Sequence, residues 1–132
     1  MGKPAVLESV PGTGRVEREL AALTGCERVL LAPSTFHLFW DLFGCLARRG
    51  MSIFLDAGSY PIVQWGVERA AGYGAPVKVF RQHDHRALHS LLKSAAGKPV
   101  VVADGYSLLR GSSSPIAEYL ESVKPMDGEQ KE

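Results

Sequence analysis

The feature that most constrains this chain is an alternation of short apolar runs with longer segments of helical periodicity. Four runs have the length and composition of buried β-strands, at residues 28–32, 52–55, 76–80 and 99–103. Each run leads into a segment whose apolar residues recur at helical spacing. This alternation predicts an α/β fold with three layers (αβα), in which helices cover both faces of a mostly parallel sheet. The valines in the run at 99–103 are typical of a strand buried on both faces.

Residues with capping chemistry mark the ends of the predicted helices. Gly25 is a natural stop for the first helix, and Pro61 suits the first position of the third. Asp84 and Ser114 are expected to cap the fourth and fifth helices through their side-chain oxygens. The second helix is apolar around much of its circumference, so we expect burial on more than one side. The predicted helices span residues 15–24, 35–49, 61–71, 85–96 and 115–122.

Length and charge limit the classes of function that the chain can have. Its 132 residues are enough for one domain with one core, and its net charge of +1 gives no strong field toward nucleic acid or membranes. The longest apolar runs are about five residues, far short of a membrane span, and no secretory signal is evident. We therefore expect a cytoplasmic protein in which Cys26 and Cys45 are buried thiols. We expect a loop or arm over residues 1–14, the α/β region over 15–123 and a disordered charged tail over 124–132.

The loops after the four predicted strands are expected to open on one edge of the sheet, where ligands of such folds bind. Ser34, Thr35 and Phe36 stand where the first strand runs into the second helix, and a helix N-terminus can bind a phosphate group. Ser34 or Thr35 is equally suited to be a plain helix cap. No glycine-rich dinucleotide or nucleotide fingerprint accompanies this junction.

Three residues in later loops are further candidates for ligand contact. Tyr60 could lay its ring on a flat ligand, or it could be a half-buried tyrosine at a helix start. Asp104 and Ser107 could orient a polar ligand, although Asp-Gly is also a common turn signal.

Three histidines are clustered at His83, His85 and His89, and the last two are four residues apart on a predicted helix. Metal binding would need a third ligand at a matching position, so we expect a solvated helix face and no metal site. No Ser–His–Asp triad can be assigned from spacing, because such triads are assembled in space.

Taken together, these segments resemble the pyridoxal-phosphate (PLP)-dependent enzymes of fold type I, the aspartate-aminotransferase-like fold, and most of all the α-oxoamine synthase group. The resemblance runs from about residue 12 to residue 120. It is carried by RELAALTG at 18–25, PSTF at 33–36, FLDA at 54–57, VFRQHD at 79–84, VVADGYS at 101–107 and PI at 115–116. It implies part of the large domain of that fold, a PLP cofactor, small amino acid substrates, and a homo-oligomer or a dimer with a full-length relative.

The resemblance also implies roles for individual residues. Ser34, Thr35 and Phe36 match the junction that holds the cofactor phosphate, although Thr35 stands where the family has a small glycine. Tyr60 matches the histidine that stacks on the pyridine ring, and it keeps an aromatic ring without the imidazole. Asp104 is similar to the family's acidic residue after the fourth strand, and Ser107 follows it.

Two catalytic groups of the family have no counterpart in these 132 residues. The family's Schiff-base lysine and its ring-nitrogen aspartate follow the segment that this chain resembles, and none of the chain's lysines stands in the matching context. We therefore expect part of a PLP-dependent transferase of the class I/II aminotransferase or α-oxoamine synthase type, inactive alone and with no catalytic residue of its own. The alternative is a non-catalytic interaction or regulatory fragment, and an independent nucleotide-binding domain is a third reading without a phosphate fingerprint.

Overall fold

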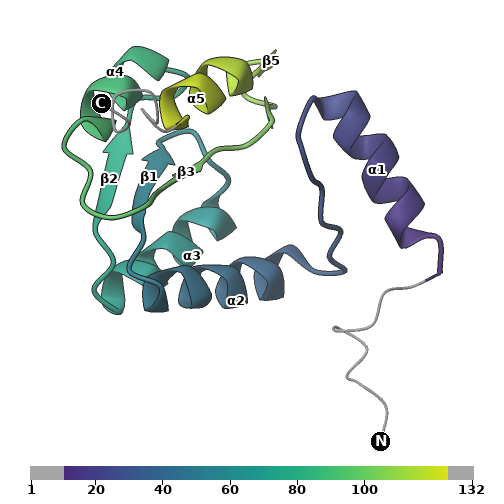
Figure 1. Ribbon diagram of the computed structural model, residues 1–132, viewed down its shortest axis with the longest axis horizontal. Coiled ribbons are helices and arrows are strands. Elements are labelled where there is room, and N and C mark those ends of the chain that lie inside the picture. Colours follow the sequence, from purple (N-terminus) through teal and green to yellow (C-terminus); the bar gives the residue numbers. More distant parts are fainter. Residues whose placement is uncertain (1–10, 125–132) are drawn as a thin grey trace, which may run out of the picture. The chain divides into compact units, whose positions relative to one another are not determined.

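A computed structural model describes residues 11–124 of the chain (Figure 1). The predicted arm and tail therefore lie mostly outside the described residues. The chain divides into two compact units, residues 1–38 and 39–132, which are described separately. The helices are α1 (Thr13–Thr24), α2 (Thr35–Arg48), α3 (Pro61–Gly72), α4 (His85–Leu92) and α5 (Ile116–Val123). The strands are β1 (Ser52–Asp56), β2 (Val77–Phe80), β3 (Pro99–Val102), β4 (Tyr106–Ser107) and β5 (Ser112–Ser113).

Strand β1 is the centre of the second unit. It pairs in parallel with β2 on one side and β3 on the other, in the order β2-β1-β3. All five of its residues are buried. Successive side chains of a strand point to opposite faces, and here Ile53 and Leu55 enter one apolar core while Phe54 enters another. Two cores on opposite faces of a parallel sheet confirm the predicted three-layer α/β architecture.

The first core is formed between the sheet and helices α2 and α3. Phe43 from α2 is 1% exposed and packs with Val63, Val67 and Ala70 from α3. The two helices approach closely because α3 has a glycine at the contact: a Cβ on Gly66 would lie 2.4 Å from a ring carbon of Phe43. This close packing fixes α3 and, with it, the loop that precedes it.

The second core lies on the other face, beneath helices α4 and α5, which Figure 1 shows side by side and away from α2 and α3. Leu88 from α4 and Tyr119 from α5 pack with Phe54 and Phe80 from the strands. The Phe80 and Tyr119 rings meet edge to face with their centroids 5.6 Å apart. This core holds the start of α4 and the middle of α5 close to the carboxyl end of β1.

Most predicted helix ends are confirmed. Gly25 ends α1 in the left-handed conformation with φ 72°, which glycine adopts without steric cost. Pro61 opens α3, and the Asp84 carboxylate accepts a hydrogen bond from the Ala87 amide at 2.9 Å. The prediction that Ser114 caps α5 is wrong. The cap position of that helix is Pro115, and the Ser114 hydroxyl is directed elsewhere.

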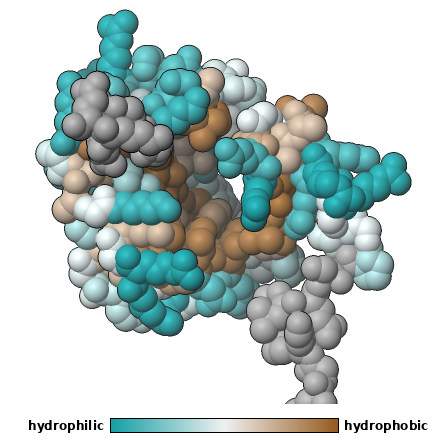
Figure 2. Space-filling model, viewed as in Figure 1, coloured by the Kyte–Doolittle hydropathy of each residue, from teal (hydrophilic) through white to brown (hydrophobic). Residues whose placement is uncertain are grey.

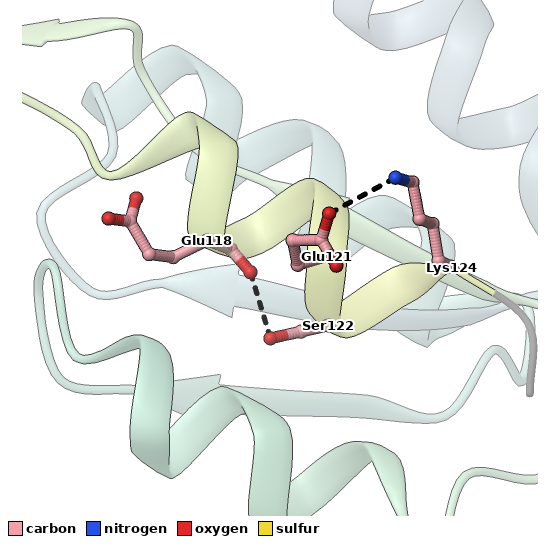
Figure 3. A network of polar contacts seen from close by, with 4 residues as sticks. All are labelled: Glu118, Glu121, Ser122 and Lys124. Carbon is pink, nitrogen blue, oxygen red and sulfur yellow. Dashed lines mark hydrogen bonds and ion pairs between the residues drawn. The ribbon is translucent and has the colours of Figure 1, made fainter.

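The last turn of α5 is held by local contacts (Figure 3). The Ser122 hydroxyl donates to the Glu118 carbonyl at 2.9 Å, and Lys124 Nζ lies 3.1 Å from a Glu121 carboxylate oxygen. The positive charge of Lys124 also interacts favourably with the negative end of the helix dipole. The ion pair is exposed, so it adds little to stability.

The predicted strand at residues 28–32 does not form. These residues have no β-bridge to any residue that the structure describes. The Leu31 amide instead donates to the Glu17 carboxylate at 3.0 Å, and Leu30 is 75% exposed. A strand is stabilised by pairing with a neighbour, and an apolar run without one gains nothing from the extended conformation.

Three expectations about burial are also wrong. The valines of β3 are half-buried, because β3 is an edge strand of the described sheet. Only Phe43 and Gly44 of α2 are buried, so this helix is not buried on more than one side. Both thiols are free, with Cys26 half-buried and Cys45 exposed, so neither contributes a buried apolar group to a core.

The described residues also include an element that the sequence did not predict. The loop at 104–113 contains a small antiparallel hairpin, β4–β5, with Tyr106 paired to Ser113 and Ser107 to Ser112. Its turn carries Leu108 and Leu109, which are almost fully exposed. None of the described helices is long and apolar enough to cross a membrane.

Candidate functional site

Three loops meet at the carboxyl edge of the described sheet. The first follows β1 at residues 57–60, the second follows β2 at 81–84, and the third follows β3 and continues into the hairpin. Hydrogen bonds join each loop to the others across 25 to 44 positions of sequence. Because parallel strands end at one edge, the fold gathers polar groups that are far apart in the chain.

The predicted residues Tyr60 and Asp104 are brought together directly. The Tyr60 amide donates to a carboxylate oxygen of Asp104 at 2.9 Å. This bond fixes the backbone at the start of α3 and leaves the Tyr60 side chain 53% exposed. The aromatic ring is therefore held on an anchored backbone with a surface open to a ligand.

The environment of Asp104 alters its acidity. Partial burial raises the pKa of the Asp104 carboxyl above its ordinary value, because a buried carboxylate loses hydration. The Tyr60 amide opposes this rise by stabilising the charged form, and the negative charge of Asp56 adds to it. The net result is a carboxyl group that holds its proton more tightly than an exposed aspartate.

Asp56, at the end of β1, connects its own loop, the loop after β2 and helix α5. It is only 2% exposed and accepts three hydrogen bonds, from the Gly58 amide at 2.8 Å, the His83 amide at 3.2 Å and the Tyr119 hydroxyl at 2.7 Å. Burial and the bond to this carboxylate both raise the pKa of Tyr119, so its hydroxyl stays protonated and donates. A buried carboxylate needs such donors to replace its lost hydration. Through them the loop after β2 and helix α5 are both bonded to the end of β1.

His83 and Ser114 form the second connection. The Ser114 hydroxyl contacts the Asp104 carbonyl as a donor and lies 3.2 Å from Nε2 of His83. The Ser114 hydroxyl has a single proton, and it donates that proton to the backbone carbonyl of Asp104. In the contact with His83 the hydroxyl oxygen is therefore the acceptor, so Nε2 of His83 carries a proton and donates it. His83 has a positive φ of 62°, unusual for a residue with a side chain, and the Asp56 and Ser114 contacts hold it there.

Ser107 is the third predicted residue at this edge. It is 7% exposed, and its hydroxyl oxygen accepts from the Gln82 side chain at 3.0 Å and from the Arg110 amide at 3.2 Å. Its own proton has no acceptor among the residues that the structure describes.

The polar groups pack tightly around one crevice. It is lined by Asp56, Gly58, Gln82, His83, Asp104, Ser107 and Ser114. Its interior has no room for a water molecule, and a Cβ on Gly58 would lie 2.2 Å from the Gln82 side chain. These residues therefore form a rigid floor, and a ligand would bind over it, beside the exposed ring of Tyr60.

The remaining predicted residues, Ser34, Thr35 and Phe36, lie in the first unit and are described by themselves. Thr35 is the first residue of α2, and Ser34 precedes it. The His37 amide is 3.5 Å from the Ser34 hydroxyl, and His37 Nδ1 is 3.0 Å from the same oxygen. Ser34 thus has cap geometry at the start of a helix, which is also the geometry that suits an anion.

The clustered histidines do not form a metal site in the described part of the chain. His85 and His89 on α4 line a groove opposite Glu118 and Glu121 on α5 (Figure 3 shows the two glutamates). No group of three or more His, Cys, Asp or Glu side chains in residues 11–124 is placed to hold a metal ion. The glutamates point along their own helix and out to solvent, where Glu121 pairs with Lys124.

Sequence inspection placed Asp56, Gln82 and His83 at strand ends on the expected ligand edge but did not name them as site residues. Ser114 was predicted only as a helix cap, and Tyr119 was not predicted at all. For Asp56 a signal was present, since a charged residue that ends a buried strand must find partners. For Tyr119 no local signal exists, because its partner lies 63 positions away. Contacts of this range are set by the packing of α5 on the sheet.

Comparison with known proteins identifies relatives of this chain. No family model matches the sequence. An 8-amino-7-oxononanoate synthase of Alcanivorax borkumensis is 28% identical over 114 residues, which are 86% of this chain and 29% of the relative. The same enzyme of Methylococcus capsulatus is 31% identical over 104 residues, 78% of this chain and 26% of the relative. The chain thus spans less than a third of the length of the curated relatives that it matches.

Solved structures agree with the fold. Serine palmitoyltransferase of Sphingomonas wittichii superposes with a TM-score of 0.68 at 23% identity, covering 91% of this chain and 30% of that one. The 8-amino-7-oxononanoate synthase of Francisella tularensis gives a TM-score of 0.62 at 17% identity, covering 87% and 32%. A high-resolution serine palmitoyltransferase structure with a PLP internal aldimine gives 0.65 at 20% identity. The homologues of this chain are therefore PLP-dependent α-oxoamine synthases of fold type I, and the chain corresponds to about 29% of their length.

Proposed function

We propose that these residues form part of a PLP-dependent transferase of the α-oxoamine synthase or class I/II aminotransferase type, acting in the cytoplasm on small amino acid substrates. The observation that carries the proposal is the Tyr60–Asp104 hydrogen bond at the carboxyl edge of a sheet whose relatives use PLP. It joins two residues that the sequence motifs single out separately. The proposal is also supported by the order of the sequence motifs and by homology that covers most of the chain.

The proposed roles follow from the chemistry of each position. Ser34, Thr35 and Phe36 hold the cofactor phosphate at the N-terminus of α2, where amide groups and the helix dipole favour an anion. Tyr60 packs its exposed ring on the pyridine ring, and Asp104 holds the Tyr60 backbone in place. PLP, when bound, supplies the electron sink of the reaction.

The residues of the second unit fit a group of this kind. PLP is flat and carries oxygen acceptors on its ring. Tyr60 offers an exposed aromatic face on a backbone fixed by Asp104. The packed floor beside it includes Ser107, whose hydroxyl proton has no acceptor among the described residues.

We further propose that the 132 residues alone do not catalyse the reaction. The chain has six lysines, at positions 3, 78, 93, 98, 124 and 131, and none stands in the family's Schiff-base context. Without that lysine the cofactor has no covalent attachment, and without the ring-nitrogen aspartate its pyridine nitrogen is not held protonated. Binding and orientation of the cofactor are then the contributions of this part.

The test is to incubate the purified chain with PLP, reduce it with borohydride and map the adducts by mass spectrometry. We expect no stoichiometric adduct at any single lysine, and only scattered low-level labelling of exposed ones. A stoichiometric adduct at one lysine would contradict the proposal of inactivity. The intact mass of the protein from its native source is a second test. A mass several times 14.3 kDa supports a part of a complete enzyme, and a mass near 14.3 kDa favours the alternative below.

The alternative is a non-catalytic fragment that pairs with a full-length relative or with itself. Exposed apolar side chains support it: Leu108 and Leu109 on the hairpin, and Trp65, which is 55% exposed on α3. Figure 2 shows hydrophobic residues at the surface. Such surface favours association. Light scattering of the purified chain tests this proposal, because a monomer at all concentrations would remove its basis.

A further inference from the structure

A polar groove at the carboxyl edge of the sheet has no part in the proposed cofactor contacts. It lies between the start of α4 and the β4–β5 hairpin. Its lining residues are Gln82, His83, Asp84, His85, Arg86, Arg110, Ser112, Ser113 and Pro115. Two arginines, two histidines and two serines in one groove make a surface rich in hydrogen-bond donors.

The arginines of this groove are available for a ligand. Ion pairs within the described residues join Arg15 to Glu19 and Lys124 to Glu121, and neither Arg86 nor Arg110 has a carboxylate partner there. Arg110 donates from Nη1 to the Gln82 carbonyl at 3.3 Å, which holds its side chain against the opposite wall and leaves its other N–H groups free to donate.

The one carboxylate of the groove is already engaged. Asp84 accepts from the Ala87 amide at 2.9 Å as the cap of α4. Its charge is opposed by two guanidinium groups, so the groove is positive even when both histidines are neutral.

The walls of the groove are also fixed in place. The His83 amide is bound to Asp56 at 3.2 Å, and the His83 ring is bound to Ser114 at 3.2 Å. The Arg110 amide is bound to Ser107 at 3.2 Å, which anchors the hairpin wall. A ligand would therefore meet donors that need little ordering.

We propose that this groove binds a phosphate-type oxyanion, with Arg86 and Arg110 as its principal ligands and Ser112 and Ser113 as further donors. Two guanidinium groups in the lining of one groove match the several oxygens of a doubly charged phosphate better than the single charge of a carboxylate. The phosphate is either free or carried on a small molecule. None of its lining residues is among Ser34, Thr35 and Phe36, where the cofactor phosphate is proposed to bind.

The experiment is a titration of the full chain with inorganic phosphate at pH 7.5, followed by backbone amide NMR, with glycerol phosphate and acetate as parallel probes. We expect saturable shifts of the Arg86, Ser112 and Ser113 amides with phosphate, and no saturation with acetate at the same concentrations. The probe that binds more tightly, phosphate or its ester, identifies the source of the oxyanion. Acetate binding as tight as phosphate binding overturns the proposal.

The variants are Arg86→Gln and Arg110→Gln, alone and combined, with Arg49→Gln as the matched control on an exposed arginine in the turn after α2. Both groove arginines are exposed, so the fold should survive, and circular dichroism checks it. We expect each single variant to weaken phosphate binding about tenfold or more, and the control to leave it unchanged. Equal affinity in the double variant overturns the proposal. Shifts confined to Ser34, Thr35 and Phe36 overturn it too, while supporting the cofactor-phosphate assignment.

Discussion

At the scale of single residues, the molecule depends most on Asp56. Its buried carboxylate accepts from one group in its own loop, one in the loop after β2 and one on α5. A charge buried to this extent costs free energy unless all of its oxygens are bonded. The three donors are therefore needed for folding, and they also set the positions of the loops that form the candidate site.

Tyr119→Phe tests this role. The change removes the hydroxyl that donates to Asp56 at 2.7 Å and keeps the ring in its core. We expect the free energy of unfolding to fall by about 1.5–3 kcal/mol, because a buried carboxylate loses a donor. Urea unfolding measures the change. Tyr106→Phe, at a 53% exposed tyrosine, is the control and should have no measurable effect; equal stabilities of the two variants would contradict this account.

Asp104 gives a prediction about pH. Its pKa is raised in the folded state, so folding is penalised when the group is ionised in both states. The penalty is fully present above the folded pKa and disappears as the pH falls through that value to the unfolded pKa, about 3.9. In Asp104→Asn the amide oxygen can still accept from the Tyr60 N–H, and the titration is lost.

We therefore expect the stability of Asp104→Asn to equal or exceed that of the unchanged chain at pH 7, and this advantage to decrease on acidification. Unfolding by urea at several pH values between 4 and 7 measures the difference. The opposite slope, with the variant losing ground as the pH rises, would show that ionised Asp104 stabilises the fold. Asp84→Asn would not serve as a control, because that carboxylate caps α4.

At the scale of secondary-structure elements, close contact between helices fixes the candidate site. Helix α3 begins at Pro61, directly after Tyr60, so the position of α3 determines where that ring is presented. The helix is held by Val63, Val67 and Ala70 against β1 and Phe43. Its approach to α2 depends on the absence of a side chain at Gly66.

Gly66→Ala tests the importance of this contact. The added Cβ would lie 2.4 Å from Phe43 Cδ2 and 3.2 Å from the Phe39 carbonyl oxygen, so the ring or the helix must move. We expect a loss of about 1–3 kcal/mol in the free energy of unfolding, because overpacking outweighs the helix propensity gained. Gly72→Ala is the matched control, with no neighbour within 4 Å at the same helix's end. A Gly66 variant as stable as that control would show that α3 has room to shift.

At the scale of the whole molecule, the chain leaves much apolar surface uncovered. Leu108 is 90% exposed and Leu109 is at the value of a fully exposed residue, side by side at the turn of the hairpin. Neither side chain gains hydrophobic stabilisation in the chain itself, and adjacent exposed apolar side chains are typical of sites that contact another protein.

The double change Leu108→Ser and Leu109→Ser tests whether this hairpin mediates association. The side chains bury almost no area in the chain itself, so the free energy of unfolding should change by less than about 0.5 kcal/mol. If the alternative function is right, the weight-average mass from light scattering should fall toward that of the monomer. Unchanged association would show that other surface is responsible, and Leu23→Ser, at an 82% exposed leucine of α1, is the control for general loss of apolar surface.

The sequence by itself determined the order of the helices and of strands β1, β2 and β3, together with most of the helix ends. Helix caps and stops such as Gly25, Pro61 and Asp84 act within a few residues of themselves, so local patterns were sufficient to place them. The alternation of strands and helices likewise determined the α/β class, and the motif order determined the relatedness to PLP-dependent α-oxoamine synthases. Tyr60, Asp104 and Ser107 were predicted as candidates because each follows the end of a strand.

Only the tertiary structure decided how those residues are held and which runs become strands. The run at 28–32 has strand composition, yet it has no β-partner in the described residues, because pairing depends on a neighbour and not on composition. The Tyr60–Asp104 bond spans 44 positions and the Tyr119–Asp56 bond spans 63. Such contacts exist because two apolar cores on opposite faces of β1 bring distant segments to one edge of the sheet, and no local pattern contains that information.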